Sequence, residues 1–303
     1  STAKILYIIY VAMTVLEIVL LLIGKMPVFD ALTITFGTAG TGGFGIKNDS
    51  IAGYSPYLQV VVTVFMILFG VNFSAYFLLL RRKFKQAFSM EEVRCYLLII
   101  LASIVVITLS IREMYGSAGE AARHAAFQVG SIITTTGYAS TDFNLWPEVP
   151  RTILVLLMFV GACAGSTGGG IKVSRLVILV KTIKKELHTL LHPRSLKKLK
   201  LDGHALEHET VRATNVFLIA YVLIFAFSVL LVAFDGNDLI TNFTAVASAL
   251  NNIGPGLELV GPLGNFGLFS NGAKLVLIFD MLAGRLEIFP LLLLFVKDTW
   301  KKF

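Results

Sequence analysis

The sequence predicts an all-α polytopic membrane protein built from tandem repeats, in which two spanning helices flank a short helix and a glycine loop. Three observations predict this fold. Hydrophobic residues make up 56% of the 303 and charged residues 15%, with a mean hydropathy of +0.79, whereas a soluble domain carries about 25% charge. Apolar stretches long enough to cross a bilayer recur along the chain. Glycine-rich loops recur between them.

Six apolar stretches are long enough, or nearly so, to cross about 30 Å of hydrocarbon. They cover residues 5–23, 58–80, 96–111, 153–180, 216–234 and 275–296. The third is short, and the fourth is interrupted by Gly165, Ser166, Thr167, Gly168, Gly169 and Gly170. The first contains Glu17 and lacks a small-residue cleavage site, so we expect a spanning helix there and not a signal peptide.

Basic residues predict how these helices are oriented. The connections 81–95 and 181–212 and the tail from residue 297 hold 16 Lys and Arg residues, whereas the connections 24–57, 112–151 and 235–272 hold 5. Because basic connections stay in the cytoplasm, we expect the first set inside and the second set outside. The net charge of +7 is then a signal of topology, and we expect no nucleic-acid partner.

Each outside connection begins with an apolar segment too short to span and then reaches a glycine beside Thr or Asn. Aligning Gly42, Gly137 and Gly254 gives separations of 95 and 117 residues, which indicates a repeat. We divide the chain into repeat A (residues 1–90, loop 38–45), repeat B (91–200, loop 133–140) and repeat C (201–303, loop 250–256). Repeat B also contains the broken span 151–180, with its glycine run at 165–170.

The loop of repeat A contains the Gly-x-Gly-x-x-Gly spacing of a dinucleotide site, at Gly40, Gly42 and Gly45. A dinucleotide loop needs a strand before it, a helix that begins at its last glycine, and an acidic residue about 20 residues further on. Only a short apolar segment precedes this loop, a polar stretch follows it, and residues 51–80 contain no Asp or Glu. The sequence therefore argues against a nucleotide here.

A bare monovalent cation fits these loops better. Irregular backbone at membrane depth occurs where it is buried in protein or lines a watery cavity, and glycine allows successive carbonyl groups to turn toward a dehydrated ion. The negative end of each short helix dipole would add to the attraction. The alternative, that the loops are surface turns between helices, stays open. The candidate ligand residues are Ala39, Gly40, Thr41 and Gly42, then Thr134, Thr135, Thr136 and Gly137, then Asn251, Asn252, Ile253 and Gly254.

The interrupted fourth span is not a phosphate loop, because Ile171 separates its last glycine from Lys172 and no Ser or Thr follows the lysine. Six small residues would melt or kink a helix, at about 1 kcal/mol per glycine relative to alanine. Two interpretations stay open: a loop with a role in the transport path, or a notch where two helices pack closely.

Arg285 lies in the last apolar stretch, near Asp280 and Glu287. A charge at that depth costs a few kcal/mol, so its side chain should face the bundle interior or water. One interpretation is a buried ion pair with Asp280 or Glu287. It is compatible with the role near a gate that the family resemblance described below implies for Arg285.

Five segments carry a family resemblance: FGTAGTGGFG, SIITTTGYASTDF, ALNNIGPGLELVG, GACAGSTGGGIK and DMLAGRLEIFP. Together they resemble the Trk/Ktr/HKT superfamily of potassium transporters, in particular its bacterial TrkH branch. The resemblance implies potassium-channel-like pore loops, K+ uptake through the inner membrane, K+ as the transported ion and no organic cofactor. It also implies a homodimer, a cytoplasmic ring of nucleotide-binding regulatory subunits of the TrkA or KtrA kind, and a gate formed by residues 165–170 and Arg285.

Members of this superfamily carry four repeats, whereas three are recognisable here, so we expect a fourth on a segment outside this sequence or a truncated form. The preference for K+ over Na+ stays open for that reason, and a Na+-coupled or Na+-conducting symporter of the same superfamily is the alternative. We expect no enzyme activity, because the outside loops offer mainly Thr, Asn and backbone groups. Repeats that all enter from one side argue against an inverted-repeat transporter.

Overall fold

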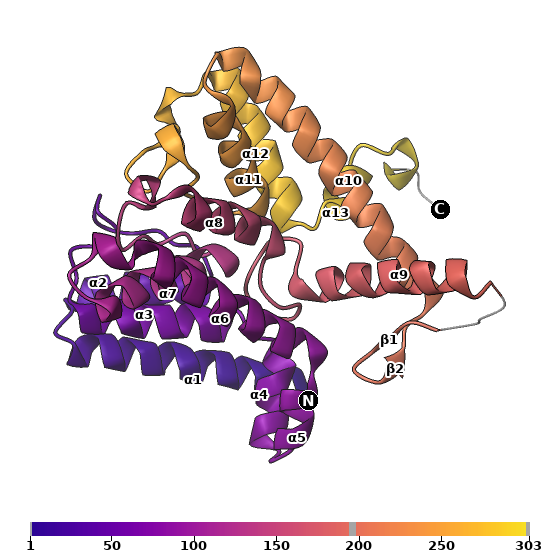
Figure 1. The fold of residues 1–303 in the computed structure, drawn as a ribbon, viewed down its shortest axis with the longest axis horizontal. Coiled ribbons are helices and arrows are strands. Elements are labelled where there is room, and N and C mark those ends of the chain that lie inside the picture. Colours follow the sequence, from indigo (N-terminus) through magenta and orange to yellow (C-terminus); the bar gives the residue numbers. More distant parts are fainter. Residues whose placement is uncertain (1, 194–197, 301–303) are drawn as a thin grey trace.

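The computed structural model describes residues 2–193 and 198–300 (Figure 1). Their regular structure is helical except for one short hairpin. The first part contains α1 (Thr2–Ile23), α2 (Val28–Ala39), α3 (Pro56–Phe69), α4 (Phe73–Leu80), α5 (Phe84–Ser89), α6 (Glu91–Ile111), α7 (Ala118–Ile133), α8 (Glu148–Val160) and α9 (Val173–Leu191). A two-stranded hairpin, β1 (Lys200–Leu201) and β2 (His204–Ala205), follows. The last part contains α10 (His208–Val232), α11 (Leu239–Asn251), α12 (Asn271–Arg285) and α13 (Phe289–Leu293). Single 3-10 turns are η1 (Arg112–Met114), η2 (Phe143–Leu145), η3 (Ala233–Asp235), η4 (Glu258–Val260), η5 (Phe266–Leu268) and η6 (Lys297–Trp300).

One order of elements occurs at three places along the chain. A long helix (α1, α6 or α10) is followed by a short helix (α2, α7 or α11), then by a loop, and then by a helix that is broken into two pieces. The broken helices are α3 with α4, α8 with α9, and α12 with α13. In Figure 1 the third group lies above the first two, and the helices α5 and α9, the hairpin and both termini lie toward the same side.

The short helices begin where local chemistry favours a start. Ser117 accepts a hydrogen bond from the Glu120 amide at the N-terminus of α7, and Asp238 accepts one from the Thr241 amide at the N-terminus of α11. Pro27 precedes α2 in the extended conformation. The Ser117 and Asp238 side chains satisfy amide groups that have no partner within the helix.

Three described helices are long and apolar enough to cross a membrane: residues 3–23, 91–114 and 208–235. The pair α3 and α4 qualifies as a fourth, although it bends by 91°. The sequence prediction of continuous second and sixth spans is therefore wrong. Gly70 and Asn72 break the second, and Glu287 and Ile288, with φ of 58° and 64°, break the sixth. The third span is longer than predicted, because α6 already begins at Glu91.

Many large apolar side chains on the long helices point away from the protein interior. Leu98 and Leu109 on α6 are 65% and 62% exposed, and Leu223 and Phe227 on α10 are similarly exposed. The polar groups Thr134, Gln128 and Asn251, by contrast, are buried. An apolar exterior around a partly polar interior is the arrangement of a protein that is surrounded by lipid.

Candidate functional site

The loops that follow α2, α7 and α11 share one backbone conformation. Each begins with a residue in the left-handed region, which residues other than glycine adopt rarely: Thr41, Thr135 and Asn252, at φ of 50°, 58° and 56°. Two positions further on, each loop has a glycine of positive φ: Gly43, Gly137 and Gly254, at 62°, 92° and 115°. Three segments that are far apart in the sequence therefore fold alike.

The hydrogen bonds fix how these loops align. The amide of Gly42 donates to the Gly37 carbonyl at 2.7 Å, the amide of Thr136 to the Ser131 carbonyl at 2.9 Å, and the amide of Ile253 to the Ser248 carbonyl at 2.9 Å. Gly43, not Gly42, therefore corresponds to Gly137 and Gly254. Our sequence alignment of the first loop is wrong by one residue, and Ala39 is the last residue of α2.

Neighbouring loops touch backbone to backbone. A β-carbon on Gly43 would lie 1.7 Å from the Thr136 carbonyl oxygen, and one on Gly137 would lie 1.8 Å from the Ile253 carbonyl oxygen. Non-bonded atoms do not approach so closely. Both the positive φ and the neighbouring backbone therefore require glycine at these positions. Among the described residues, neither the Thr136 nor the Ile253 carbonyl accepts a hydrogen bond.

The side chains of these loops are largely engaged within the protein. The Thr134 hydroxyl donates to the Gly130 carbonyl at 2.7 Å and lies 2.8 Å from the Thr136 hydroxyl. In the third loop, the Asn251 amide group pairs with the Tyr221 hydroxyl at 2.8 and 3.0 Å. Since these side chains already have partners, the backbone carbonyl groups are the oxygen atoms most available to a cation.

The break between α8 and α9 lies against all three loops. The Gly169 amide donates to the Thr135 hydroxyl at 2.8 Å, and the Thr41 hydroxyl donates to the Thr167 carbonyl at 3.0 Å. A β-carbon on Gly169 would lie 3.0 Å from the Asn251 carbonyl oxygen. The run of small residues at 165–170 therefore packs against the loops of all three groups.

The same run is also bonded to the break between α3 and α4. The Cys163 amide donates to the Gly70 carbonyl, and the Phe73 amide to the Gly165 carbonyl, both at 3.0 Å. Backbone groups that two broken helices leave unpaired thus satisfy one another. The sequence analysis missed this break, although Asn72 signals it: its side chain accepts a hydrogen bond from the Ser74 amide at 2.9 Å and so begins α4.

Glu92, which the sequence analysis also missed, joins three elements in the interior. This carboxylate is 5% exposed. One of its oxygens accepts from the amides of Ala164 and Ser174, at 2.5 and 3.1 Å, and the other accepts from the Asn72 side chain at 3.3 Å. Glu92 on α6 thus holds both ends of the run at 165–170.

Glu92→Gln should lower the thermal midpoint of the protein in detergent by about 5 °C. The substitution replaces an oxygen acceptor with a donor, and one lost hydrogen bond to a charged group costs about 1.5–3 kcal/mol. Fluorescence-detected size-exclusion chromatography after heating measures the midpoint. Glu113→Gln is the matched control, because Glu113 is exposed in η1, directly after the other end of α6. Equal midpoints for the two variants would contradict the role of Glu92.

Arg285 lies at the C-terminal end of α12 and lines two cavities. The larger, about 710 Å³, is also lined by Gly40, Thr41, Ile253 and Gly254. The smaller, about 400 Å³, is also lined by residues 166–170. Arg285 therefore lies next to both the loops and the glycine run.

Of the two interpretations of Arg285 left open by the sequence, the ion pair with Asp280 or Glu287 does not form among the described residues. Glu287 instead pairs with Lys172 at 2.5 Å and with Arg175 at 2.6 Å. Asp280 accepts a hydrogen bond from Ser228 at 2.7 Å. The chain turns just after Arg285, which directs Glu287 toward α9. Within the described part of the chain Arg285 has no ion-pair partner.

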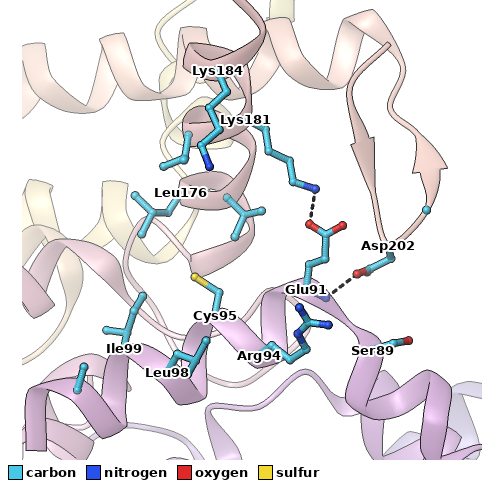
Figure 2. Close-up of a pocket in the computed structure, with 14 residues that line it drawn as sticks. Ser89, Glu91, Arg94, Cys95, Leu98, Ile99, Leu176, Lys181, Lys184 and Asp202 are labelled. Carbon is cyan, nitrogen blue, oxygen red and sulfur yellow. Dashed lines mark hydrogen bonds and ion pairs between the residues drawn. The ribbon is translucent and has the colours of Figure 1, made fainter. Parts of the chain in front are cut away.

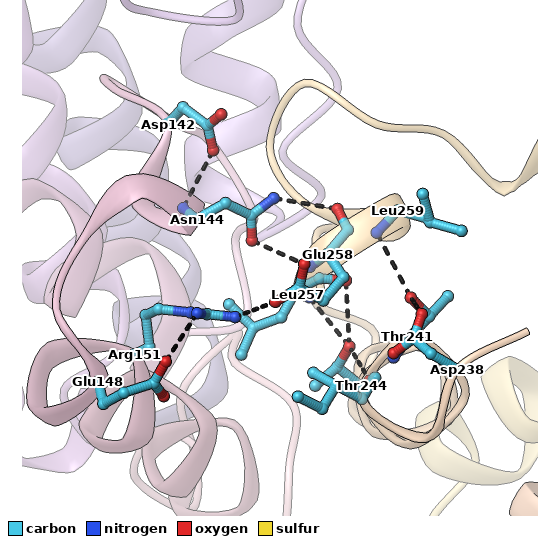
Figure 3. A network of polar contacts seen from close by, with 11 residues as sticks. Asp142, Asn144, Glu148, Arg151, Asp238, Thr241, Thr244, Leu257, Glu258 and Leu259 are labelled. Carbon is cyan, nitrogen blue, oxygen red and sulfur yellow. Dashed lines mark hydrogen bonds and ion pairs between the residues drawn. The ribbon is translucent and has the colours of Figure 1, made fainter.

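A polar network joins the segments that follow the second and third loops (Figure 3). The Asn144 side chain donates to the Glu258 carbonyl and accepts from the Glu258 amide, both at 3.0 Å. Arg151 pairs with both Glu148 and Glu258. On the other side of the network the Thr244 hydroxyl accepts from the Leu257 amide at 2.9 Å. These contacts fix the two loops relative to each other.

The short helices carry acidic residues at their N-terminal ends, where the positive end of the helix dipole favours them. These are Asp30, Glu120 and Asp238. Hydrogen bonds from the Thr241 hydroxyl and amide hold the pKa of Asp238 below its usual range. The opposite, negative ends of the same helices meet at the loops, which makes the loops favourable for a cation.

This arrangement defines the class of the molecule: a helical membrane protein whose loops and glycine run converge inside it. The chain belongs to the TrkH family of cation transport proteins, whose sequence model matches residues 1–302. That family is one of cation transport proteins.

Similar proteins support this assignment. The chain is 38% identical over its full length to the Trk system potassium uptake protein TrkH of Salmonella typhimurium, and 37% identical to that of Escherichia coli K12. It spans 63% of the length of each of these relatives. The crystal structure of the potassium transporter TrkH from Vibrio parahaemolyticus superposes with a TM-score of 0.90 at 36% identity, covering 99% of this chain and 65% of that one.

Proposed function

We infer that this chain forms three of the four repeats of a potassium-uptake pore. The observation that carries the proposal is the meeting of three like loops, each at the C-terminal end of a short helix, where the Thr136 and Ile253 carbonyl groups accept no hydrogen bond from any described residue. The loops have glycine where they touch, and their side chains already form hydrogen bonds within the protein. Both features favour a site made of backbone oxygen atoms, as a dehydrated K+ requires. The names of the similar proteins support potassium as the ion.

The proposed K+ ligands are backbone groups of residues 40–43, 134–137 and 251–254. Relative to the candidates drawn from the sequence, Gly43 replaces Ala39. Thr134, Thr135, Thr136 and Gly137 keep their places, as do Asn251, Asn252, Ile253 and Gly254. We propose the same division into repeats A, B and C: residue 90 directly precedes α6, and residue 200 lies in the hairpin between α9 and α10.

The glycine run at 165–170 acts in this proposal as a gate beneath the ion site, with Arg285 as a fixed charge beside it. This run accepts a hydrogen bond from the Thr41 hydroxyl and donates one to the Thr135 hydroxyl, which supports that role over a simple packing notch between helices. Arg285 supports it too, because its guanidinium has no described partner and lines the cavities on both sides. A positive charge there opposes the passage of a cation.

The complete protein is proposed to be a homodimer in a bacterial inner membrane, with its basic connections in the cytoplasm. The connection 181–212 is the proposed docking face for a ring of nucleotide-binding regulatory subunits, because it is the longest basic connection. Lys197 in this connection lies outside the described residues. Co-purification with such a subunit, before and after neutralising Lys198 and Lys200, tests the docking face, and light scattering tests the dimer.

Flux into liposomes that contain the complete protein tests the proposed function. A K+ or Rb+ gradient should drive uptake, whereas an equal Na+ gradient should drive at least about tenfold less, a difference of about 1.4 kcal/mol between the two ions. Empty liposomes are the control. Uptake that ignores K+ and Rb+ gradients would exclude the pore, and equal uptake of Na+ would favour the Na+-conducting alternative.

A further inference from the structure

A groove of about 830 Å³ lies between the first turns of α6, the first turns of α9 and the hairpin (Figure 2). One end of it is charged and the other is apolar. The charged end is lined by Glu91, Arg94, Lys181, Lys184 and Asp202, and the apolar end by Leu98, Ile99, Ala102, Leu176, Val177 and Val180. Its size lies within the ~300–1,000 Å³ range of small-molecule sites.

The charged end has an excess of positive charge. Glu91 forms an ion pair with Lys181, and Asp202 accepts a hydrogen bond from the Glu91 amide at 2.6 Å. Both carboxylates are therefore engaged, as the dashed lines in Figure 2 show. Arg94 and Lys184 have no partner among the described residues, so two cations are available to a ligand at the mouth of the groove.

The apolar end extends along a helix that can cross the membrane. Residues 91–114 form one of the stretches long and apolar enough to span. Leu98 and Ala102 lie about 10 and 16 Å along this helix from Glu91, at a rise of ~1.5 Å per residue. The groove therefore runs from a cationic rim to a depth where hydrocarbon is the surrounding medium.

We propose that this groove binds one anionic phospholipid, with its phosphate between Arg94 and Lys184 and an acyl chain along the apolar end. A phosphate favours paired cations, and Lys or Arg near a membrane surface attracts anionic lipid. An acidic segment of a soluble partner could contact the rim, but it could not fill the part that lies at membrane depth. A phospholipid matches both ends of the groove, with its phosphate at the charged end and its acyl chain at the apolar end.

A lipid bound here would join α6 to α9. Glu92, the residue after Glu91, holds Ala164 and Ser174, and α9 begins just after the glycine run. If the proposed gate is correct, the lipid would stabilise the position of that run. The binding site itself does not depend on the transport function, so a binding measurement separates the two ideas.

Native mass spectrometry of the delipidated complete protein, titrated with phosphatidylglycerol or phosphatidylcholine, tests the site. Phosphatidylglycerol should bind more tightly. The double variant Arg94→Gln with Lys184→Gln should weaken its binding about thirtyfold, which corresponds to ~1 kcal/mol for each cation removed. Ala102→Trp should weaken binding of the same lipid by filling the apolar end without a change of charge.

The double variant Lys85→Gln with Lys185→Gln is the matched control, because it removes two cations, one on α5 and one on α9, that do not line the groove. Its affinity for phosphatidylglycerol should stay within about twofold of the unaltered protein. Equal binding of the two lipids, or an equal loss in the control, would overturn the proposal. So would unchanged binding in the groove variants, or glycerol phosphate binding as tightly as the lipid.

Discussion

Gly137→Ala should abolish discrimination between K+ and Na+ in the complete protein. The added β-carbon would lie 1.8 Å from the Ile253 carbonyl oxygen, so one of the two loops must move. The φ of 92° at this position is also strained for any residue with a side chain. Because a dehydrated ion is held by oxygen atoms at fixed distances, we expect the K+ over Na+ uptake ratio to fall at least about tenfold, which is ~1.4 kcal/mol.

Gly236→Ala is the control that tests the effect of backbone strain alone, without the displacement of a neighbouring carbonyl group. Gly236 also has a positive φ, 77°, but a β-carbon there would have no neighbour within 4 Å. This variant should lose some stability and keep its ion preference. Gly43→Ala should behave like Gly137→Ala, because its β-carbon would lie 1.7 Å from the Thr136 carbonyl oxygen. If Gly137→Ala folds and still prefers K+, the ion does not bind at these loops.

The sequence predicted the helical membrane fold and the positions of the loops because both depend on local composition. The length of the apolar stretches predicted the long helices, and glycine beside Thr or Asn predicted the loops. The alignment of the first loop with the other two could not be predicted from local composition. Gly40, Gly42, Gly43 and Gly45 offer several alignments, and the loop hydrogen bonds, the positive φ and the contact with Thr136 together select Gly43.

The breaks and the partners of charged residues depended on contacts between distant segments. Glu92 reads as an ordinary acidic residue in the first turn of a helix, and its partners Ala164 and Ser174 lie over 70 residues away. The alternative interpretation of Arg285, an ion pair with Asp280 or Glu287, considered only acidic residues near it in the sequence. Glu287 instead pairs with Lys172 and Arg175, and Asp280 accepts a hydrogen bond from Ser228, all on distant segments of the chain.

Arg285→Ala should raise cation flux in the absence of any regulatory subunit about a hundredfold. A dehydrated cation that passes a fixed positive charge at ~6 Å faces roughly 3 kcal/mol at an effective dielectric of about 20. Arg285→Lys keeps the charge and should keep most of the block. Lys274→Ala is the matched control. Lys274 is also a cation on α12 and lines the same larger cavity, but its ammonium group donates to the Gly267 carbonyl at 3.2 Å, away from the glycine run.

Combining Arg285→Ala with deletion of residues 168–170 distinguishes one barrier from two. If the charge and the glycine run obstruct the same path, each change alone should raise flux, and the double variant should gain less than the product of the two effects. Multiplicative effects would mean that they act at separate points. Should Arg285→Ala fold normally and leave flux at the level of Lys274→Ala, the guanidinium does not face the ion path. The glycine run, held by Thr41, Thr135 and Glu92, would then be the barrier by itself.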